Sequence, residues 1–385
     1  MNAMLAAPPR QVLVIALRYL GDVLLTTALP HALRAHYPGC QIDMLVFRGT
    51  EGMLQNNPDI REVFTIAERP KREEMRAMLR RLWRRYDVAL VPQPGDKPHL
   101  FGLTSARLRL GLVPPHASHA WWKRLSLRRP LLVDEQAHRI HENERVAALL
   151  GIASARTVVP PTAHTAVHAW PARLTGAGPA AAFDILRPFA IVHPSPRWHY
   201  KRWHAEGWRA LVAALQHQGL QVLLSGGPGA AEAGYLDELM DGLDARERAG
   251  VLRIHGRLSL AELADLLRHA SLYVGPDTAT THLAATCGTP TLALFGPTDP
   301  CQWGPSPAAG LDQPWLKSAP RQVRGNVVML QHASKPCIPC RNEGCDRHHA
   351  SRSACLDELP AGTVVAEALR LLPAPAADAA TEAAV

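Results

Sequence analysis

The stretch that most constrains the fold of this chain is residues 271–305, SLYVGPDTATTHLAATCGTPTLALFGPTDPCQWGP. It contains an apolar run that ends in Gly275 and Pro276, a segment rich in small residues, and a second apolar run that begins at Thr291. Because no other connection fits between the two runs, they predict a parallel strand–helix–strand unit. The helix would begin at the carboxyl edge of a parallel sheet, where its free backbone N–H groups can bind a phosphate.

Two polar side chains stand out in this otherwise apolar unit. Asp277 follows the first apolar run, and His282 lies within the predicted helix, which Thr278 opens. The local pattern is also compatible with an Asp277 that only caps the helix and with a hydrogen-bonded interior His282. The residues alone leave both roles open.

The same segment resembles the signature of glycosyltransferase family 9, the lipopolysaccharide heptosyltransferases. The family pattern runs roughly DTGxxHLAAAxGxPxxxLFGPTxPxxxGP, and this chain follows it in register from Asp277 onward. Ala279 stands where the family usually has glycine, the residue that allows the closest approach of a ligand to the backbone. The resemblance implies a nucleotide-sugar donor that is bound by Asp277, Thr278, Ala279 and His282.

Strand and helix patterns alternate through the first part of the chain. Strand patterns occupy residues 11–17, 41–47, 62–66 and 87–91, and helical patterns occupy residues 22–36, 49–55 and 73–86. Such alternation predicts a doubly wound parallel sheet. With the resemblance, the expected fold is α/β of the GT-B type, in which two Rossmann-like doubly wound domains face each other across a cleft.

Changes in composition suggest where the domains begin and end. A stretch rich in Ala, Pro, Gly and Thr separates two regions of regular pattern, and we interpret it as a connection. We also expect the last helix to cross back onto the first domain. The expected parts are an N-terminal acceptor-binding domain (1–155), an interdomain linker (156–187), a C-terminal nucleotide-sugar-binding domain (188–360) with a Cys-rich segment (337–355), a last helix (361–372) and a disordered tail (373–385).

An acidic residue begins the helix that follows the first predicted strand. Gly21 permits a tight turn, and Asp22 stands at the helix start, where an acidic residue is favoured, so an ordinary capping role also explains it. The segment RYLGDVLLTTALPHALRAHYPGCQIDMLV resembles the opening element of the family, RxxxxGDxLLxTPxLRxLRxxxPxAxIxxLV. That resemblance implies that Asp22 is the general base, and we expect the neighbouring Arg18 to bind the acceptor.

The second half of the chain carries further donor-binding candidates. HPSPRWHYKRWHAEGWRALVAAL resembles a family element in which a lysine before a tryptophan contacts the donor phosphates, which implies Lys201 with Ser195 nearby. A glycine-rich turn at residues 226–229 resembles the donor loop, which implies that Glu232 holds the ribose hydroxyls. The loop of Leu258 resembles the one whose backbone meets the adenine.

The net charge of +8 lies wholly in the N-terminal part of the chain. Residues 1–150 hold 22 Lys and Arg against 14 Asp and Glu, whereas residues 151–385 hold 20 of each kind. A basic surface suits nucleic acid, anionic lipid or phosphorylated sugar. Given the resemblance, we expect a lipid A–core glycolipid and the inner face of the cytoplasmic membrane as partners, and no nucleic acid.

Residues 116–132, HASHAWWKRLSLRRPLL, combine tryptophans with basic side chains. This pattern suits a membrane surface or a phosphorylated glycolipid, and a plain exposed loop is the alternative. We expect Lys123, Arg124 and Arg128 to bind the acceptor.

Four of the seven cysteines, Cys337, Cys340, Cys345 and Cys355, have a spacing that can surround one tetrahedral metal ion. A structural Zn or Fe site and reduced, metal-free cysteines both remain open. No cofactor is expected for catalysis, because the predicted cleft elements contain no DxD-like acidic pair. The odd cysteine count, without a signal peptide, indicates a reducing cytoplasm.

The resemblance implies an inverting transfer of heptose from ADP-heptose to the phosphorylated inner core of lipopolysaccharide. No apolar run approaches the roughly 18–20 residues that span a bilayer, so we expect a cytoplasmic protein that is peripheral on the inner membrane. One alternative is a transferase of the same fold that uses another nucleotide sugar for a capsule, another glycan or a protein acceptor. A remoter one is a non-catalytic protein that binds nucleotides or polyanions.

Overall fold

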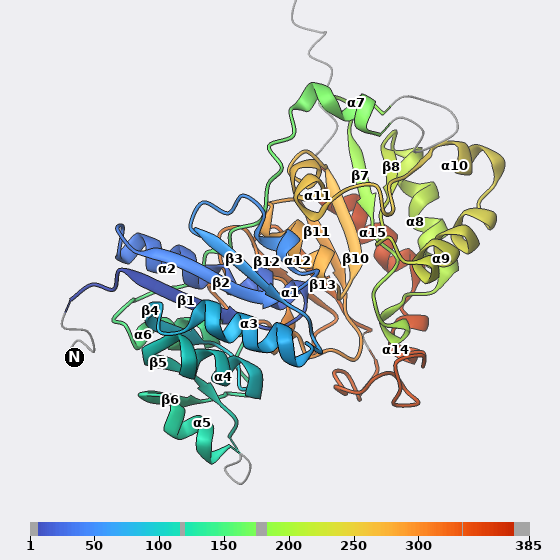
Figure 1. Ribbon diagram of the computed structural model, residues 1–385. Helices are drawn as coiled ribbons and strands as arrows, with labels where there is room; N and C mark the ends of the chain where they lie inside the picture. Colours follow the sequence, from blue (N-terminus) through green and yellow to red (C-terminus); the bar gives the residue numbers. More distant parts are fainter. Residues whose placement is uncertain (1–6, 116–119, 175–182, 333, 373–385) are drawn as a thin grey trace, which may run out of the picture.

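The computed structural model describes residues 7–115, 120–174, 183–332 and 334–372, so the expected disordered tail lies outside the described residues. The chain forms two lobes, each built on one sheet with helices on both faces (Figure 1). We call the lobe with strands β1 to β6 the first lobe and the lobe with strands β7 to β13 the second lobe.

The first lobe contains a six-stranded parallel sheet in the order β3-β2-β1-β4-β5-β6. Its central strand β1 buries every residue except the first, as a continuous apolar run in a parallel sheet does. The strands are β1 (Gln11–Ala16), β2 (Gln41–Phe47), β3 (Glu62–Ile66), β4 (Tyr86–Val91), β5 (Ala106–Val113) and β6 (Arg129–Leu132). The helices are α1 (Leu20–Thr26), α2 (Ala28–His36), the 3-10 helix η1 (Glu51–Leu54), α3 (Arg72–Leu82), α4 (Asp96–Ser105), α5 (Trp121–Ser126) and α6 (Arg139–Ala148).

The second lobe contains a seven-stranded sheet in the order β12-β13-β11-β10-β7-β8-β9, in which only β12 is antiparallel. The strands are β7 (Phe189–Val192), β8 (Gln221–Leu224), β9 (Val251–Arg253), β10 (Leu272–Pro276), β11 (Thr291–Leu294), β12 (Arg321–Arg324) and β13 (Val327–Leu330). The helices are η3 (His199–Lys201), α8 (Ala205–His217), α9 (Ala230–Asp241), α10 (Ala245–Ala249), α11 (Leu260–Leu267), α12 (Ala279–Thr286), α13 (Pro300–Trp303), α14 (Ala354–Asp357) and α15 (Ala361–Leu371).

Both sheets have a point where the strand order reverses, between β1 and β4 in the first lobe and between β7 and β10 in the second. Ligands of doubly wound folds bind beyond the carboxyl ends of the strands at such a point. Helix α1 packs against α12, and an apolar cluster that includes Leu24, Leu263 and Leu283 continues from one lobe into the other. The expected GT-B architecture is confirmed.

Three predicted helices differ in detail from the structure. The helix expected over residues 22–36 is divided into α1 and α2 at Thr27, because Pro30 has no N–H to donate back to the preceding turn. The segment at residues 49–55 forms only the short 3-10 helix η1. Helix α3 ends at Leu82, and Tyr86 already belongs to β4.

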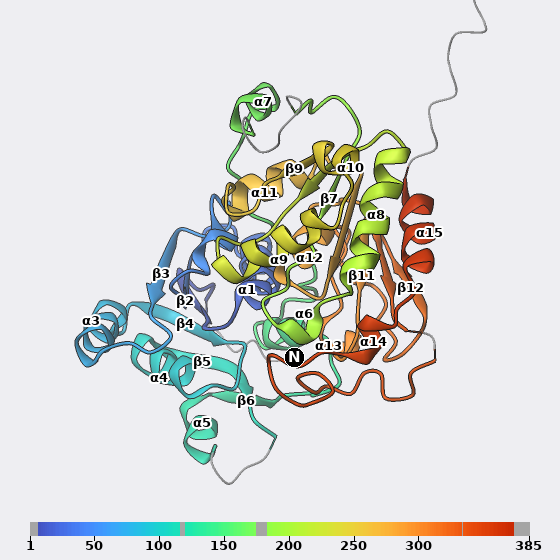
Figure 2. The same ribbon diagram turned by 90° about the vertical axis from the view of Figure 1, so that its right-hand side faces the viewer.

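The last helix does not cross back onto the first lobe, so that expectation is wrong. Helix α15 lies beside α8 of the second lobe (Figure 2). Val364 and Ala368 are buried in the same cluster as Trp208, and Glu367 pairs with Arg321 of β12. The apolar face of α15 therefore packs within its own lobe.

The connecting segment carries a 3-10 helix η2 (Val167–Ala169) and a short helix α7 (Trp170–Arg173). The carboxylate of Asp265 in α11 accepts hydrogen bonds from the Thr162 hydroxyl and from the backbone N–H groups of Ala163 and Thr165. This contact attaches the segment to the second lobe, and the exact domain boundaries stay a prediction. Within the described ranges, every helix is too short or too polar to cross a membrane.

Candidate active site

A cleft of about 1190 Å³ lies between the two lobes. The first lobe lines it with residues 18–22, 47–50 and 68. The second lobe lines it with the loops that follow β7, β8, β9, β10 and β11, and with residues 341–343. The carboxyl ends of the strands in both sheets therefore open into one space, as the topology requires.

Asp22 faces this cleft from the first turn of α1. Arg18, four residues earlier, donates from Nε to Asp22 Oδ1 at 3.3 Å, and 15% of the Asp22 side chain is exposed. Gly21 lies directly against the second lobe, because a methyl group at that position would come within 3.4 Å of His282 Cδ2. The contact of α1 with α12 thus brings the Asp22 carboxylate next to the second lobe.

Lys201 and Asp277 form an ion pair on the opposite wall. Lys201 ends η3 in the loop after β7, Asp277 follows β10, and the ammonium donates to Asp277 Oδ2 at 2.5 Å. Burial opposes both charges, but the pairing outweighs it. The pKa of Lys201 is therefore raised, and the pKa of Asp277 is lowered by the charge of Lys201 and by hydrogen bonds from Lys201 and Thr298. Both groups stay charged at neutral pH.

Helix α12 begins at the same wall. Thr278 is its N-cap, and the Thr278 side chain makes no capping hydrogen bond, so the first N–H groups of the helix have no side-chain acceptor there. Ser195 Oγ is buried without a hydrogen-bond partner among the described residues, and it lines the same wall. Ala279 lines the cleft beside Thr278. This group of donors can accommodate an anionic ligand.

His282 lies one turn further into α12 and is 5% exposed. Burial lowers its pKa, and the negative charges of Asp277 and Asp22 offset that effect only in part. Its Nδ1 atom has no partner among the described residues. His282 is therefore a neutral imidazole close enough to both Asp277 and Asp22 to feel their charges, and its Nδ1 is free among the described residues.

Glu232 and Leu258 line the end of the cleft near β8 and β9. Glu232, in the first turn of α9, accepts a hydrogen bond from the Gly227 N–H at 2.6 Å. A methyl group on Gly227 would lie 2.7 Å from Glu232 Oε1, so a larger residue would displace the Glu232 carboxylate from this position. Leu258 lines the cleft beyond Gly256. All nine donor-binding and catalytic candidates from the sequence therefore line one cleft: Asp22, Ser195, Lys201, Glu232, Leu258, Asp277, Thr278, Ala279 and His282.

Three of the four acceptor-binding candidates do not reach the cleft, whereas Arg18 does. Lys123 is buried, and its ammonium contacts the Pro94 carbonyl at 2.9 Å and Asp96 at 2.7 Å. Arg124 donates to the Pro115 carbonyl, and Arg128 is exposed just before β6. Lys123 holds α5 onto the start of α4, because its ammonium contacts the Pro94 carbonyl and the Asp96 carboxylate there.

The four clustered cysteines carry no disulfide, and no group of three or more His, Cys, Asp or Glu side chains in the described ranges is arranged to hold a metal ion. The pKa of Cys355 is raised to about 12, mainly by burial and further by the other three cysteines, so that the thiol is protonated. The segment around them also contacts the loop of Lys201. Ser353 donates to the Tyr200 carbonyl, and His349 stacks on Trp198 at 4.0 Å.

Several cleft residues were missed by the sequence reasoning. His193 forms part of the floor, where its Nδ1 lies 2.9 Å from Ser225 Oγ and burial lowers its pKa to about 4. Trp303 belongs to the signature segment and follows β11, a position that could have identified it. Arg341, which pairs with Asp299, reaches the cleft from the Cys-rich segment. No local sequence pattern could have predicted that this segment lines the cleft.

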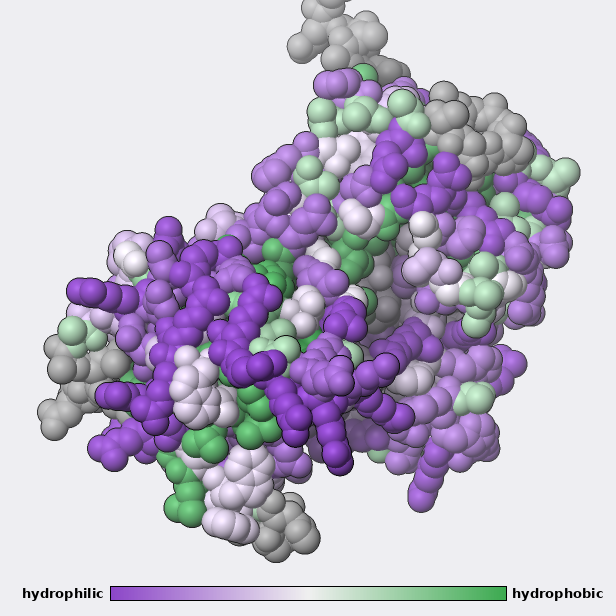
Figure 3. Space-filling model, in the orientation of Figure 1, coloured by the Kyte–Doolittle hydropathy of each residue, from purple (hydrophilic) through white to green (hydrophobic). Residues whose placement is uncertain are grey.

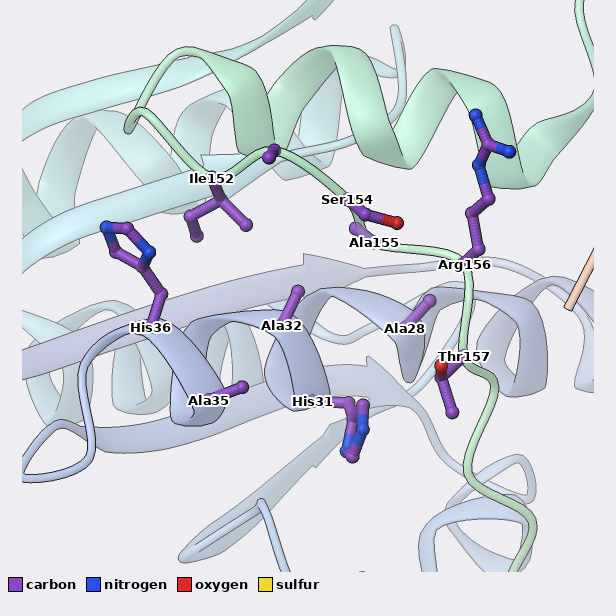
Figure 4. Close-up of a pocket in the computed structure, with 11 residues that line it drawn as sticks. Ala28, His31, Ala32, Ala35, His36, Ile152, Ser154, Ala155, Arg156 and Thr157 are labelled. Carbon is purple, nitrogen blue, oxygen red and sulfur yellow. The ribbon is translucent and has the colours of Figure 1, made fainter. Parts of the chain in front are cut away.

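A second hollow, of about 370 Å³, lies between α2 and residues 152–157 (Figure 4). Five of its eleven lining residues are alanines. Two of its polar side chains are already paired, because His31 contacts Asp59 at 2.9 Å and Arg156 contacts Glu144 at 2.7 Å.

Comparison with known proteins gives one consistent result. The family model of glycosyltransferase family 9 (heptosyltransferase) matches residues 75–337. Lipopolysaccharide heptosyltransferase 3 of Escherichia coli K12 is 28% identical over 372 residues, with 94% of this chain and 98% of the relative covered. Lipopolysaccharide heptosyltransferase 1 of Pseudomonas aeruginosa is 31% identical over 347 residues, with 87% of each chain covered.

A solved structure, the ADP-heptose lipopolysaccharide heptosyltransferase II of E. coli, superimposes with a TM-score of 0.71 at 19% identity, covering 94% of this chain and 98% of the other. The match supports the fold of two facing lobes. Since the family model covers more than half of the sequence, the chain belongs to glycosyltransferase family 9, and it is a glycosyltransferase.

Proposed function

We propose that this chain transfers heptose from ADP-heptose to a hydroxyl group of the phosphorylated lipid A–core glycolipid, with inversion at the anomeric carbon. The observation that carries the proposal is the shared cleft. An acidic side chain of the first lobe, Asp22, and a phosphate-type site of the second lobe, with Lys201 and the start of α12, line the same space. We assign residues 1–155 to the acceptor and residues 188–360 to the donor. The curated relatives named as lipopolysaccharide heptosyltransferases support the sugar and the acceptor class.

On the donor side, the pyrophosphate would lie against the first N–H groups of α12, the Ser195 hydroxyl and the Lys201 ammonium. Fixed dipoles and charges at these positions stabilise the negative charge that grows on the departing ADP. Glu232 would then hold the ribose hydroxyls, and the Leu258 backbone would meet the adenine. Asp277 would bind sugar hydroxyls, and it keeps Lys201 oriented through their ion pair.

On the acceptor side, Asp22 would accept the proton of the attacking hydroxyl. The new bond joins that oxygen to the anomeric carbon, and the bond from the anomeric carbon to the ADP oxygen breaks on the opposite face. Arg18, at 3.3 Å, holds the carboxylate in orientation. A positioned base contributes about 10²- to 10⁴-fold to the rate, and alignment of the two substrates contributes several kcal/mol more.

No step of this mechanism is derived through a metal ion. The transfer needs only a base, a cationic site for the leaving group and alignment, all of which the cleft residues can provide. A structural metal at Cys337, Cys340, Cys345 and Cys355 would need these thiols to converge, and in the described residues they form no such group. We propose that the segment acts as a support for the Lys201 loop.

We also propose that the first lobe docks on the inner face of the cytoplasmic membrane. Leu103 of α4 and Trp121 and Leu125 of α5 are exposed, the last two by 64% and 75%. In Figure 3 this part of the first lobe lies beside the hydrophilic surface of α3, which carries four arginines. Apolar side chains flanked by basic ones are typical of a contact with anionic lipid.

The proposal is tested by incubating the purified chain with ADP-heptose and lipopolysaccharide cores truncated at successive inner-core positions. Release of ADP and a mass increase of one heptose on one of these cores are expected. Calorimetry with ADP, UDP and GDP should give binding of ADP alone. Transfer from a UDP or GDP sugar instead would identify a same-fold transferase with another donor, and transfer from none of them would overturn the proposal.

A further inference from the structure

A cationic and aromatic cluster lies beside Asp22 and contains two residues, Arg139 and Trp303, that the proposed mechanism does not use. Trp303, the last residue of α13 in the second lobe, lines the cleft. The guanidinium carbon of Arg18 lies 5.9 Å from the centre of its ring, and that of Arg139 lies 5.3 Å from it. Arg139 is the first residue of α6, so the cluster joins both lobes at the position of the proposed base.

Arg139 has no anionic partner. Among the described residues, its guanidinium makes no hydrogen bond or ion pair, and its contact is with the Trp303 ring. Two carboxylates lie nearby, but Asp22 is bonded to Arg18, and Glu142 is bonded to Arg145 at 2.6 Å. A guanidinium has five N–H donors, and a charge that is partly removed from water is normally paired.

The electrostatics agree with this geometry. Burial lowers the pKa of Arg139, and the positive charge of Arg18 lowers it further, whereas Asp22 and Glu142 raise it only in part. The charge of Arg139 is therefore incompletely balanced by the protein. An added negative charge at this place would stabilise it.

A hydrogen bond between the lobes fixes the position of Arg139. The preceding residue, His138, caps α6 by accepting from the Ile140 N–H, and its Nε2 donates to the Gly304 carbonyl at 2.7 Å. Gly304 directly follows Trp303, so this bond holds the neighbours of Arg139 and of Trp303 together. The cluster is thus part of the interface between the lobes.

We propose that Arg139, together with Arg18 beside Trp303, binds an anionic substituent of the acceptor sugar, a phosphate or a carboxylate, next to the hydroxyl that attacks. This inference rests on the proposed function. Arg139 begins α6 of the first lobe, which the proposed function assigns to the acceptor, so its ligand is the acceptor. It is an acceptor-binding and specificity-determining residue.

The test measures binding of core oligosaccharide, released from its lipid, to the full chain saturated with ADP. One arm compares the oligosaccharide before and after removal of its phosphates, and the other compares it before and after reduction of its carboxyl groups. The wild-type chain is expected to prefer the anionic form in one arm by at least about tenfold, as a charge-assisted contact gives. Arg139→Ala should lose that preference, Arg139→Lys should keep part of it, and both should bind ADP as the wild type does.

Arg76→Ala is the matched control, because it removes one positive charge from an exposed position of α3 in the same lobe. It should leave the preference intact. An unchanged preference in Arg139→Ala, or no preference of the wild type in either arm, would overturn the inference. If Arg139→Ala fails to bind ADP, Arg139→Gln replaces it, since it keeps the bulk of the side chain. Because binding is measured without turnover, a failure of heptose transfer by the wild type would count against the proposed function alone.

Discussion

The Lys201 ammonium lies 2.5 Å from the Asp277 carboxylate, and the two residues are 76 positions apart in the sequence. They are neighbours because β7 and β10 are adjacent parallel strands at the point where the strand order of the second sheet reverses. The pair places one cation at the N-terminus of α12, where an anion is already favoured. Donor binding should therefore depend on Lys201.

Replacement of Lys201 by alanine should weaken ADP binding about 10- to 100-fold, since a hydrogen bond to a charged group contributes about 1.5–3 kcal/mol. Calorimetric titration with ADP measures this change. Lys317→Ala, at an exposed position of the same lobe, should bind ADP as the wild type does. Equal ADP affinity of the Lys201 variant and the wild type would remove Lys201 from the donor site.

Replacement of Asp22 by asparagine should lower kcat by about 10²- to 10⁴-fold, because the amide keeps the shape of the side chain but cannot accept the proton. ADP affinity should stay within about twofold, since Asp22 belongs to the other lobe. Steady-state rates of ADP release and a parallel ADP titration separate the two effects. A variant that loses ADP binding and keeps kcat would contradict the assignment of the lobes.

The stability of the protein should depend on pH through its buried histidines. The pKa of His138 is lowered to about 3, chiefly by burial, so the folded chain keeps this imidazole neutral. The unfolded chain takes up a proton below its ordinary pKa of about 6.5. The contribution of His138 to the free energy of unfolding is therefore complete above that pH. Below it, the free energy of unfolding falls by up to ~1.4 kcal/mol for each unit by which the pH decreases.

Urea denaturation at pH 7, 6 and 5 checks this dependence in the wild type and in His138→Ala. The variant should be less stable at pH 7 by about 1–3 kcal/mol, because the buried Gly304 carbonyl loses its donor. Its stability should also fall less steeply below pH 6.5, although His193 and His282 still contribute in the same direction. If the free energy of unfolding fell equally with decreasing pH in the two proteins, His138 would not take up a proton on unfolding.

Binding to membranes should depend on the exposed apolar residues of α5. The double variant Trp121→Ser and Leu125→Ser should bind vesicles that contain anionic lipid several-fold more weakly. The reason is that it lacks two apolar side chains that would be buried in the lipid on binding. Vesicle sedimentation measures the bound fraction. Leu186→Ser, at a leucine that is 85% exposed in another part of the chain, is the control and should change nothing. If the double variant and Leu186→Ser lost vesicle binding to the same extent, the α5 surface would have no specific role in docking.

Treatment with EDTA should leave the initial rate of heptose transfer unchanged, since the proposed mechanism uses only protein side chains. The rate is measured before and after chelation and again after added Mg²⁺ or Zn²⁺. Metal analysis of the same protein tests the Cys-rich segment separately. A rate that falls on chelation and returns with one metal would require a metal-dependent mechanism.

The amino-acid sequence by itself determined the parallel unit around Asp277 and the positions of Asp22, Lys201 and Glu232 at the ends of strands. These features follow from local periodicity and from motifs a few residues long, and doubly wound sheets collect strand ends at one edge. The sequence could not show that Lys123 is buried against Asp96, that α15 packs on α8, or that Arg139 and Trp303 meet beside Asp22. Those relationships arise from the packing of one lobe on the other and from hydrogen bonds such as His138 to Gly304, between residues 166 positions apart. Only the tertiary structure decides such contacts, because no local pattern encodes which distant surfaces bury each other.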